Sequence, residues 1–121
     1  MATPPKIVNR KVFAEGAPIF HEGSEGDVAY IVLSGQVEIW RTADGQRKRL
    51  GVVRQGGIFG EMAMIDNRPR MASASALEPT QVAIVTKSDF QQRMKDSDPV
   101  IAAVLRILAE QVRRLSAPQP G

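Results

Sequence analysis

The sequence contains no cysteine and only one histidine, His21. Without cysteine there is no disulfide framework, no thiolate metal site and no cysteine nucleophile. One imidazole is also too few for the metal centre of a cupin-type enzyme, which combines two or three histidines with a carboxylate. We therefore expect neither a metal site nor a cofactor.

Motifs of common catalytic machinery are missing too. The sequence has no Gly-x-Ser-x-Gly nucleophile elbow and no Walker-type glycine loop with a lysine. His21 lies in a turn-rich stretch, where an exposed position is more typical than a catalytic one. These absences predict a protein that is not an enzyme.

Long apolar runs are also absent. The first residues, Met1 to Lys6, lack the apolar core of a signal peptide, and no later run approaches the length needed to cross a bilayer. We expect a soluble, cytoplasmic protein with no membrane segment.

The formal charge is +3, which suits an anionic ligand without specifying one. A basic cluster, Arg47-Lys48-Arg49, is flanked by Arg41 and Arg54. No basic helix or helix-turn-helix pattern accompanies the cluster, so we interpret it as a solvated hairpin. Nucleic-acid binding through this turn is a weaker alternative.

The length of 121 residues predicts a single domain over 1–121, with about residues 6–115 folded and short tails at both ends. Short apolar runs separated by glycine-rich turns predict strands, and Asp44-Gly45 is the strongest hairpin signal. This pattern is typical of a small antiparallel β-barrel or jelly roll. The expected strands occupy 8–13, 30–33, 37–40, 50–53, 72–77 and 81–85.

Helical signals gather at the end of the chain. Thr86 and Asp89 have the spacing of a capping box, and Ser97 or Asp98 is expected to cap a last helix whose first turn holds Pro99. The stripe of apolar residues in that helix is expected to pack mostly against the barrel. It consists of Ile101, Val104, Leu105, Leu108, Val112 and Leu115.

The stretch from Phe59 to Ala74 contains the residues best suited to bind a ligand. Gly60 opens a run of good helix formers, Glu61 to Met64, so free backbone N–H groups of a helix N-terminus are expected beside Gly60 and Glu61. After the turn signal Asp66-Asn67, Pro69 presents Arg70, whose planar guanidinium matches two phosphate oxygens at once. A carboxylate such as Glu61 fits beside a phosphate if it accepts hydrogen bonds from a neutral hydroxyl, for example that of a ribose.

Phe59-Gly60-Glu61-Met62-Ala63-Met64, followed by Pro69-Arg70-Met71-Ala72-Ser73, resembles the phosphate-binding cassette of cyclic nucleotide-binding domains. The nine-residue spacing from Glu61 to Arg70, with proline before the arginine, is a specific signal. Glycines and apolar residues of the first half of the chain also fall where the barrel turns and strands of this family do, so the resemblance covers nearly the whole chain. It implies an antiparallel barrel with a short cassette helix and a C-terminal helical lid.

The resemblance implies a role for each matching residue. Glu61 would bind the ribose 2′-hydroxyl, and Arg70 the cyclic phosphate with help from the backbone N–H groups of Met62 and Ala63. The full set of expected ligand-binding residues is Phe59, Gly60, Glu61, Met62, Ala63, Arg70, Met71 and Ala72. The last helix would form a lid over the base, with Val104, Leu105 or Leu108 as its apolar cover.

Met71 departs from the family pattern, in which a serine or threonine after the arginine helps to hold guanine. Methionine offers no hydroxyl, so the ligand is expected to be cyclic AMP, with cyclic GMP as the alternative. The implied function is a regulatory sensor whose last helix responds to the ligand and acts on an effector domain or protein outside these residues. The rival interpretation is a barrel that binds no nucleotide and mediates protein–protein contacts.

Overall fold

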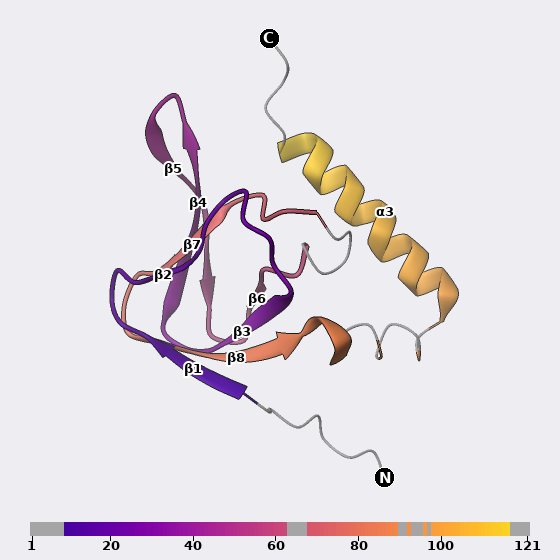
Figure 1. Ribbon diagram of the computed structural model, residues 1–121, viewed down its shortest axis with the longest axis horizontal. Helices are drawn as coiled ribbons and strands as arrows, with labels where there is room; N and C mark the ends of the chain where they lie inside the picture. The colour runs from indigo at the N-terminus through magenta and orange to yellow at the C-terminus, as the bar shows by residue number, and fades with distance from the viewer. Residues whose placement is uncertain (1–8, 63–67, 90–91, 93–95, 97, 117–121) are drawn as a thin grey trace.

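The computed structural model describes residues 9–62, 68–89, 92, 96 and 98–116. Strands make up most of this part, and one long helix follows them (Figure 1). The elements are β1 (Asn9–Phe13), β2 (Pro18–Phe20), β3 (Val28–Ser34), β4 (Gln36–Ala43), β5 (Gln46–Arg54), β6 (Ile58–Phe59), β7 (Ser73–Ala76), β8 (Thr80–Thr86) and α3 (Pro99–Ser116).

The strands form two antiparallel four-stranded sheets, one ordered β1-β8-β3-β6 and the other β2-β7-β4-β5. Both sheets contribute to one apolar core, so the core lies between them. Its buried members are Phe13, Tyr30, Val32, Val37, Phe59, Ala74, Ala76 and Val82. The predicted mainly antiparallel β fold with a C-terminal helix is confirmed.

The hairpin between β4 and β5 turns at Asp44-Gly45, as the sequence predicts. Both residues have positive φ, 53° and 75°, which is the backbone of a type I′ turn. Ala43 pairs with Gln46 directly across the turn. The register shifts once, between Ile39 and Trp40, so the hairpin contains a bulge.

The cassette connects β6 to β7. Gly60 has a φ of 81°, which a side chain would disfavour, and the helical backbone begins at Met62. The second half of the predicted helix from Glu61 to Met64, and the turn at Asp66-Asn67, fall within residues 63–67, outside the described part.

Side-chain caps mark the starts of the helical segments as expected. The Asp98 carboxylate accepts a hydrogen bond from the Val100 N–H at 2.8 Å, so Asp98 caps α3, while Ser97 lies outside the described residues. The Thr86 hydroxyl accepts one from the Asp89 N–H at 3.2 Å. None of the helices in the described residues is long and apolar enough to cross a membrane.

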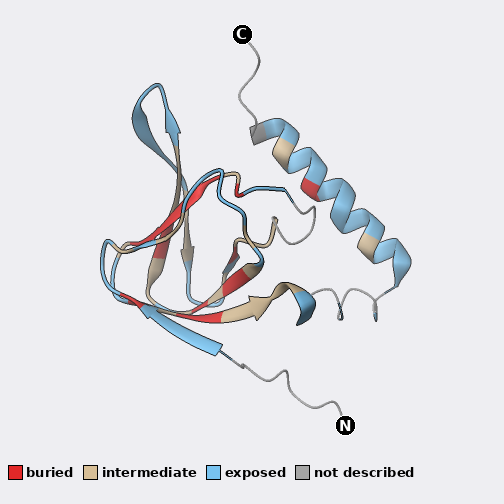
Figure 2. Ribbon diagram, viewed as in Figure 1, coloured by how far each residue is buried: buried red, intermediate tan, exposed pale blue. Residues whose placement is uncertain are grey.

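The orientation of α3 differs from the expectation. The helix runs along one side of the barrel and is exposed over most of its surface (Figure 2). Its large apolar side chains keep between 36% and 86% of their surface exposed. The barrel is faced instead by Ala109, which is 3% exposed, and by the half-buried Ala102 and Arg113. The stripe therefore does not pack mostly against the barrel, because small side chains occupy the face that does.

Candidate functional site

The backbone of Arg70 is fixed to the loop that joins β2 and β3. The Arg70 N–H donates to the Ser24 carbonyl at 2.8 Å, and the Gly23 N–H donates to the Arg70 carbonyl at 2.7 Å. Pro69 precedes Arg70 and restricts the backbone further. The position of the arginine is therefore set by contacts that do not involve its side chain.

The Arg70 side chain is turned inward and is 5% exposed. Its Nη1 donates to the Gly60 carbonyl at 2.6 Å, and its Nη2 to the Val28 carbonyl at 2.7 Å. The guanidinium lies over the Phe20 ring, 4.2 Å from the ring centroid. The Nε atom is buried and has no hydrogen-bond partner. This buried cation thus has one donor that no group in the described part of the chain satisfies.

Two glycines make room for this guanidinium. A Cβ on Gly26 would overlap Nε and the guanidinium carbon of Arg70. A Cβ on Gly60 would lie 2.7 Å from Nη1. The residue types at 26 and 60 therefore decide where the charge of Arg70 can lie.

Burial and the neighbouring ionisable groups have opposite effects on the pKa of Arg70. Burial lowers the pKa of Arg70, while Tyr30, Asp27 and Glu61 act in the opposite direction. Burial also raises the pKa of the Tyr30 phenol, which Arg70 partly offsets. Arginine stays protonated throughout the physiological range, so the site presents a desolvated positive charge.

A cavity of about 270 Å³ opens beside Arg70. Strand residues form an apolar wall, the cassette forms the polar end, and one residue comes from α3. The lining residues are Phe20, Ile39, Leu50, Val53, Ile58, Phe59, Gly60, Glu61, Met62, Arg70, Met71, Ala72 and Val112. The cavity thus combines an apolar surface with one carboxylate and one buried guanidinium.

The cavity brings together most of the residues that the sequence analysis selected. Phe59, Gly60, Glu61, Met62, Arg70, Met71 and Ala72 all line it. Ala63 is among the residues outside the described part. The expected lid residues Val104, Leu105 and Leu108 do not line the cavity and are 47%, 36% and 51% exposed.

Sequence reasoning did not select the residues of the apolar wall, and it did not include Val112 among the expected lid residues. Ile39 and Val53 lie in predicted strands without an expected ligand role, and Phe20 lies outside the predicted strands and the expected ligand-binding set. Val112 belongs to the recognised stripe, one turn beyond Leu108. Leu50 and Ile58 keep 47% and 49% of their surface exposed at the cavity, a feature that appears only in the folded structure.

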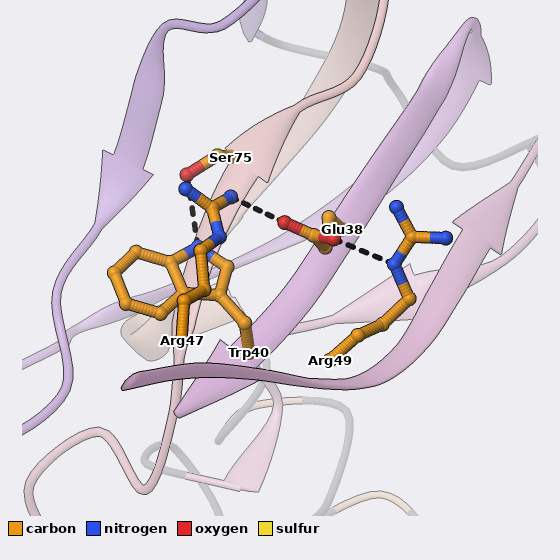
Figure 3. Close-up of polar contacts among 5 residues, drawn as sticks. All are labelled: Glu38, Trp40, Arg47, Arg49 and Ser75. Atoms are coloured by element: carbon orange, nitrogen blue, oxygen red, sulfur yellow. Dashed lines mark hydrogen bonds and ion pairs between the residues drawn. The ribbon is translucent and has the colours of Figure 1, made fainter. Parts of the chain in front are cut away.

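The basic hairpin has a structural explanation (Figure 3). Arg47 and Arg49 of β5 both pair with the buried Glu38 of β4, and Arg47 also lies over the Trp40 ring, 4.1 Å from its centroid. The Trp40 indole N–H donates to the Ser75 hydroxyl at 3.1 Å. Burial opposes ionisation of Glu38, but the hydrogen bonds from Arg49 and Arg47 outweigh it and lower the pKa of this carboxyl.

Metal chemistry finds no support in the described residues, where no three His, Cys, Asp or Glu side chains gather as a metal site would require. The lining of the cavity is suited to reversible recognition of a ligand. Its charged end suits an anion with a neighbouring hydroxyl, and its apolar wall suits a flat, weakly polar group.

Similar proteins carry the same kind of domain. Residues 10–97 match the family model of the cyclic nucleotide-binding domain. The cyclic AMP receptor protein of Thermus thermophilus is 33% identical over 105 residues, which is 86% of this chain and 49% of that protein. A cAMP-dependent protein kinase regulatory subunit of Yarrowia lipolytica is 32% identical over 96 residues, which is 74% of this chain and 25% of that protein.

A solved structure with high similarity is that of the EAL enzyme Bd1971, known in a cAMP-bound and a cGMP-bound form. Each form has a TM-score of 0.84 and 40% identity, and the match covers 88% of this chain and 28% of the other. This chain therefore spans about half or less of the length of these proteins. From the family match and these relatives, the chain belongs to the cyclic nucleotide-binding domain family.

Proposed function

We propose that this chain is a regulatory domain that binds cyclic AMP in the cavity beside Arg70. The observation that carries the proposal is the convergence of Glu61, Arg70 and an apolar wall on one cavity beneath α3. Each of the three features suits a different part of a cyclic nucleotide: hydroxyl, phosphate and base. The cavity volume of about 270 Å³ is close to the lower end of the range typical for small-molecule sites, about 300–1,000 Å³.

Arg70 would bind the cyclic phosphate. Its buried Nε lacks a hydrogen-bond partner, while Nη1 and Nη2 are held by the Gly60 and Val28 carbonyls. A phosphate oxygen that accepts from Nε would satisfy this donor and neutralise the buried charge. The backbone N–H groups of Met62 and Ala63 would add donors at the start of the cassette helix.

Glu61 would accept a hydrogen bond from the ribose 2′-hydroxyl. It is half-buried and lines the same cavity as Arg70. A carboxylate at this place repels a bare phosphate, so its presence favours a ligand that offers a hydroxyl beside its anionic group. This combination separates a ribose phosphate from simple anions.

The base would lie against the apolar wall, with Val112 of α3 as part of its cover. Met71 lines the cavity next to Arg70 and provides no hydroxyl for the polar edge of guanine. Cyclic AMP is therefore the favoured ligand, and cyclic GMP the second.

The response to the ligand would be carried by α3. Among the side chains of this helix whose burial is described, only Ala109 is fully buried, and such limited packing would let the ligand shift the helix. An effector domain or protein would sense that shift. We infer a non-catalytic, cytoplasmic sensor in which the described residues act as one domain.

Calorimetric titration of nucleotide-stripped protein with cyclic AMP and cyclic GMP tests the proposal. We expect micromolar or tighter binding of cyclic AMP and weaker binding of cyclic GMP. Arg70→Lys keeps the charge but loses the planar guanidinium, and Glu61→Gln keeps the shape but loses the carboxylate. Loss of a charge-assisted hydrogen bond costs about 1.5–3 kcal/mol, so each variant should weaken binding roughly 10- to 100-fold.

Arg10→Ala is the matched control, because Arg10 is an exposed arginine on β1 away from the cavity. It should bind cyclic AMP as the wild type does. Folded, empty wild-type protein that releases or absorbs no heat with either nucleotide would overturn the proposal and favour a barrel that only mediates protein contacts.

A further inference from the structure

Two polar contacts in the described part of the chain join α3 to Arg68 of the cassette. The Arg68 Nη2 pairs with Glu110 Oε1 at 3.0 Å, and the Arg113 Nη2 donates to the Arg68 carbonyl at 3.4 Å. Glu110 and Arg113 occupy neighbouring positions one turn apart on α3. The large apolar side chains of α3 keep 36% to 86% of their surface exposed, so these polar contacts add to a small packed interface.

Arg68 is tied closely to the phosphate end of the site. Only Pro69, whose ring fixes φ, separates it from Arg70. The backbone of Arg70 is held by Ser24 and Gly23. A movement of the cassette at Arg70 is therefore passed to Arg68 over a short and stiff piece of chain.

The turn of α3 that contacts Arg68 also contributes to the cavity, at the place where the base is proposed to lie. Val112, the residue of α3 that lines the cavity, lies between Glu110 and Arg113 in the same helical turn. Contacts that fix Glu110 and Arg113 to Arg68 thus fix Val112 over the cavity as well.

We propose that Arg68 is a positioning residue, which together with Glu110 and Arg113 forms a latch between the cassette and α3. The latch couples occupancy of the Arg70 site to the position of Val112, and this inference rests on the proposed function. By thermodynamic linkage the coupling is reciprocal: a bound nucleotide strengthens the latch, and an intact latch slows nucleotide release.

Besides pairing with Arg68, Glu110 reduces the repulsion between positive charges on α3 and on the cassette. A cleft of about 450 Å³ lies between the cassette and α3. Its charged lining residues are Arg41, Arg68, Arg70, Arg113 and Arg114, with Glu22 and Glu110 as its carboxylates. Glu110 thus lies among arginines from both sides of the cleft. Its removal leaves positive charges of α3 facing those of the cassette, which favours separation of the helix from the barrel.

The expected effect is modest and reversible. The side chains of Arg68 and Glu110 are 52% and 48% exposed, so solvent and salt screen their attraction. Loss of the pair should speed nucleotide release roughly two- to fivefold, which is the range expected for an exposed ion pair. The effect should shrink at high salt concentration.

A double-mutant cycle tests the latch. The variants are Arg68→Ala, Glu110→Ala and the double variant, with Arg106→Ala as the control for loss of one exposed charge from α3. One readout is the dissociation rate of cyclic AMP measured by displacement of a fluorescent analogue. The other is hydrogen exchange of the α3 backbone in nucleotide-free protein, which requires no ligand.

Each single variant should release cyclic AMP two- to fivefold faster and show faster exchange in α3. The double variant should be no worse than the more severe single variant, and the swap of Arg68→Glu with Glu110→Arg should restore part of the loss. Arg106→Ala should behave as the wild type. A purely structural role would change stability without this non-additivity in the dissociation rates.

Dissociation and exchange rates in Arg68→Ala that equal those of the wild type would overturn the latch. Additive effects of the two single variants would overturn it as well. Failure of the wild type to bind any cyclic nucleotide would overturn the proposed function instead, and hydrogen exchange of α3 would still decide whether Arg68 holds the helix.

Discussion

The guanidinium of Arg70 occupies the space that a side chain on residue 26 would fill. Gly26 allows this approach because a Cβ there would overlap Nε, the buried donor without a partner. The two residues are 44 positions apart in the sequence, and their contact fixes where the positive charge of the site lies. A glycine in the β2–β3 loop is thus part of the surroundings of Arg70 and of the proposed phosphate site, although it contributes no functional group.

Gly26→Ala tests this relationship. We expect the variant to fold, because the overlapping atoms belong to a side chain that can move, but the guanidinium must leave its position. Loss of its charge-assisted hydrogen bonds should weaken cyclic AMP binding roughly 10- to 100-fold. Gly51→Ala is the control, because a Cβ on Gly51 meets no atom within 4 Å. Calorimetry on both variants measures the difference, and equal affinities would contradict the role of Gly26.

Glu38 should make stability depend on pH. Its hydrogen bonds with Arg49 and Arg47 lower its folded pKa below the ordinary value of 4.5. A carboxyl with a lowered folded pKa stabilises the protein fully above the unfolded pKa, and this contribution is lost as pH falls through the folded pKa. Glu38→Gln should cost about 1–2 kcal/mol at pH 7, since the arginines are half exposed.

The cost of Glu38→Gln should shrink as pH falls below about 4.5. Urea denaturation at a series of pH values measures it. Glu15→Gln removes one carboxylate from an exposed turn and is the control for net charge. A cost that is constant from neutral to acidic pH would show that Glu38 contributes through packing instead of through its charge.

Met71 should control the choice between the two nucleotides. Met71→Thr places a hydroxyl beside Arg70 in the cavity, where guanine offers polar groups to bind it. One added hydrogen bond is worth about 0.5–1.5 kcal/mol, so the affinity for cyclic GMP relative to cyclic AMP should rise roughly 2- to 10-fold. Met71→Val has a similar shape without the hydroxyl and should leave the ratio unchanged. A ratio that moves equally in both variants would assign selectivity to side-chain volume.

Val112 should matter for binding more than the other apolar residues of α3. It lines the cavity, whereas Val104 does not, and the two are similarly exposed at 45% and 47%. Val112→Ala removes two methyl groups from the expected base contact and should weaken cyclic AMP binding roughly three- to tenfold. Val104→Ala is a matched control and should have no effect. The reverse result would place the lid one or two turns earlier, where the sequence had suggested it.

Local signals in the sequence predicted most of the strands and the cassette. Asp44-Gly45 specified its turn because only a few residue types tolerate positive φ at both positions. The spacing from Glu61 to Arg70 indicated the candidate site, and both residues, which belong to one short segment, line the same cavity. Such features depend on neighbours in the sequence and can be read from it.

Contacts between distant segments could not be predicted in this way. The hydrogen bond from Arg70 to the Val28 carbonyl joins residues 42 positions apart, and nothing in the local pattern marks it. The face of α3 that meets the barrel could not be predicted from the sequence either. The apolar stripe suggested one face, but the small side chain of Ala109 allows closer approach and takes the buried position. The orientation of a helix depends on the shape of the helix surface and of the barrel surface that it meets. The sequence of the helix describes only the first of these.

The most direct test of this account is to locate bound cyclic AMP relative to Arg70 and Val112. Intermolecular nuclear Overhauser effects, measured on methyl-labelled protein saturated with cyclic AMP, report which methyl groups lie near the base. We expect cross-peaks from the base protons to Val112 and to Ile39 or Val53 of the cavity wall, and none to Val104. Saturated protein whose base protons contact none of the cavity residues would contradict the central claim that the nucleotide occupies this cavity.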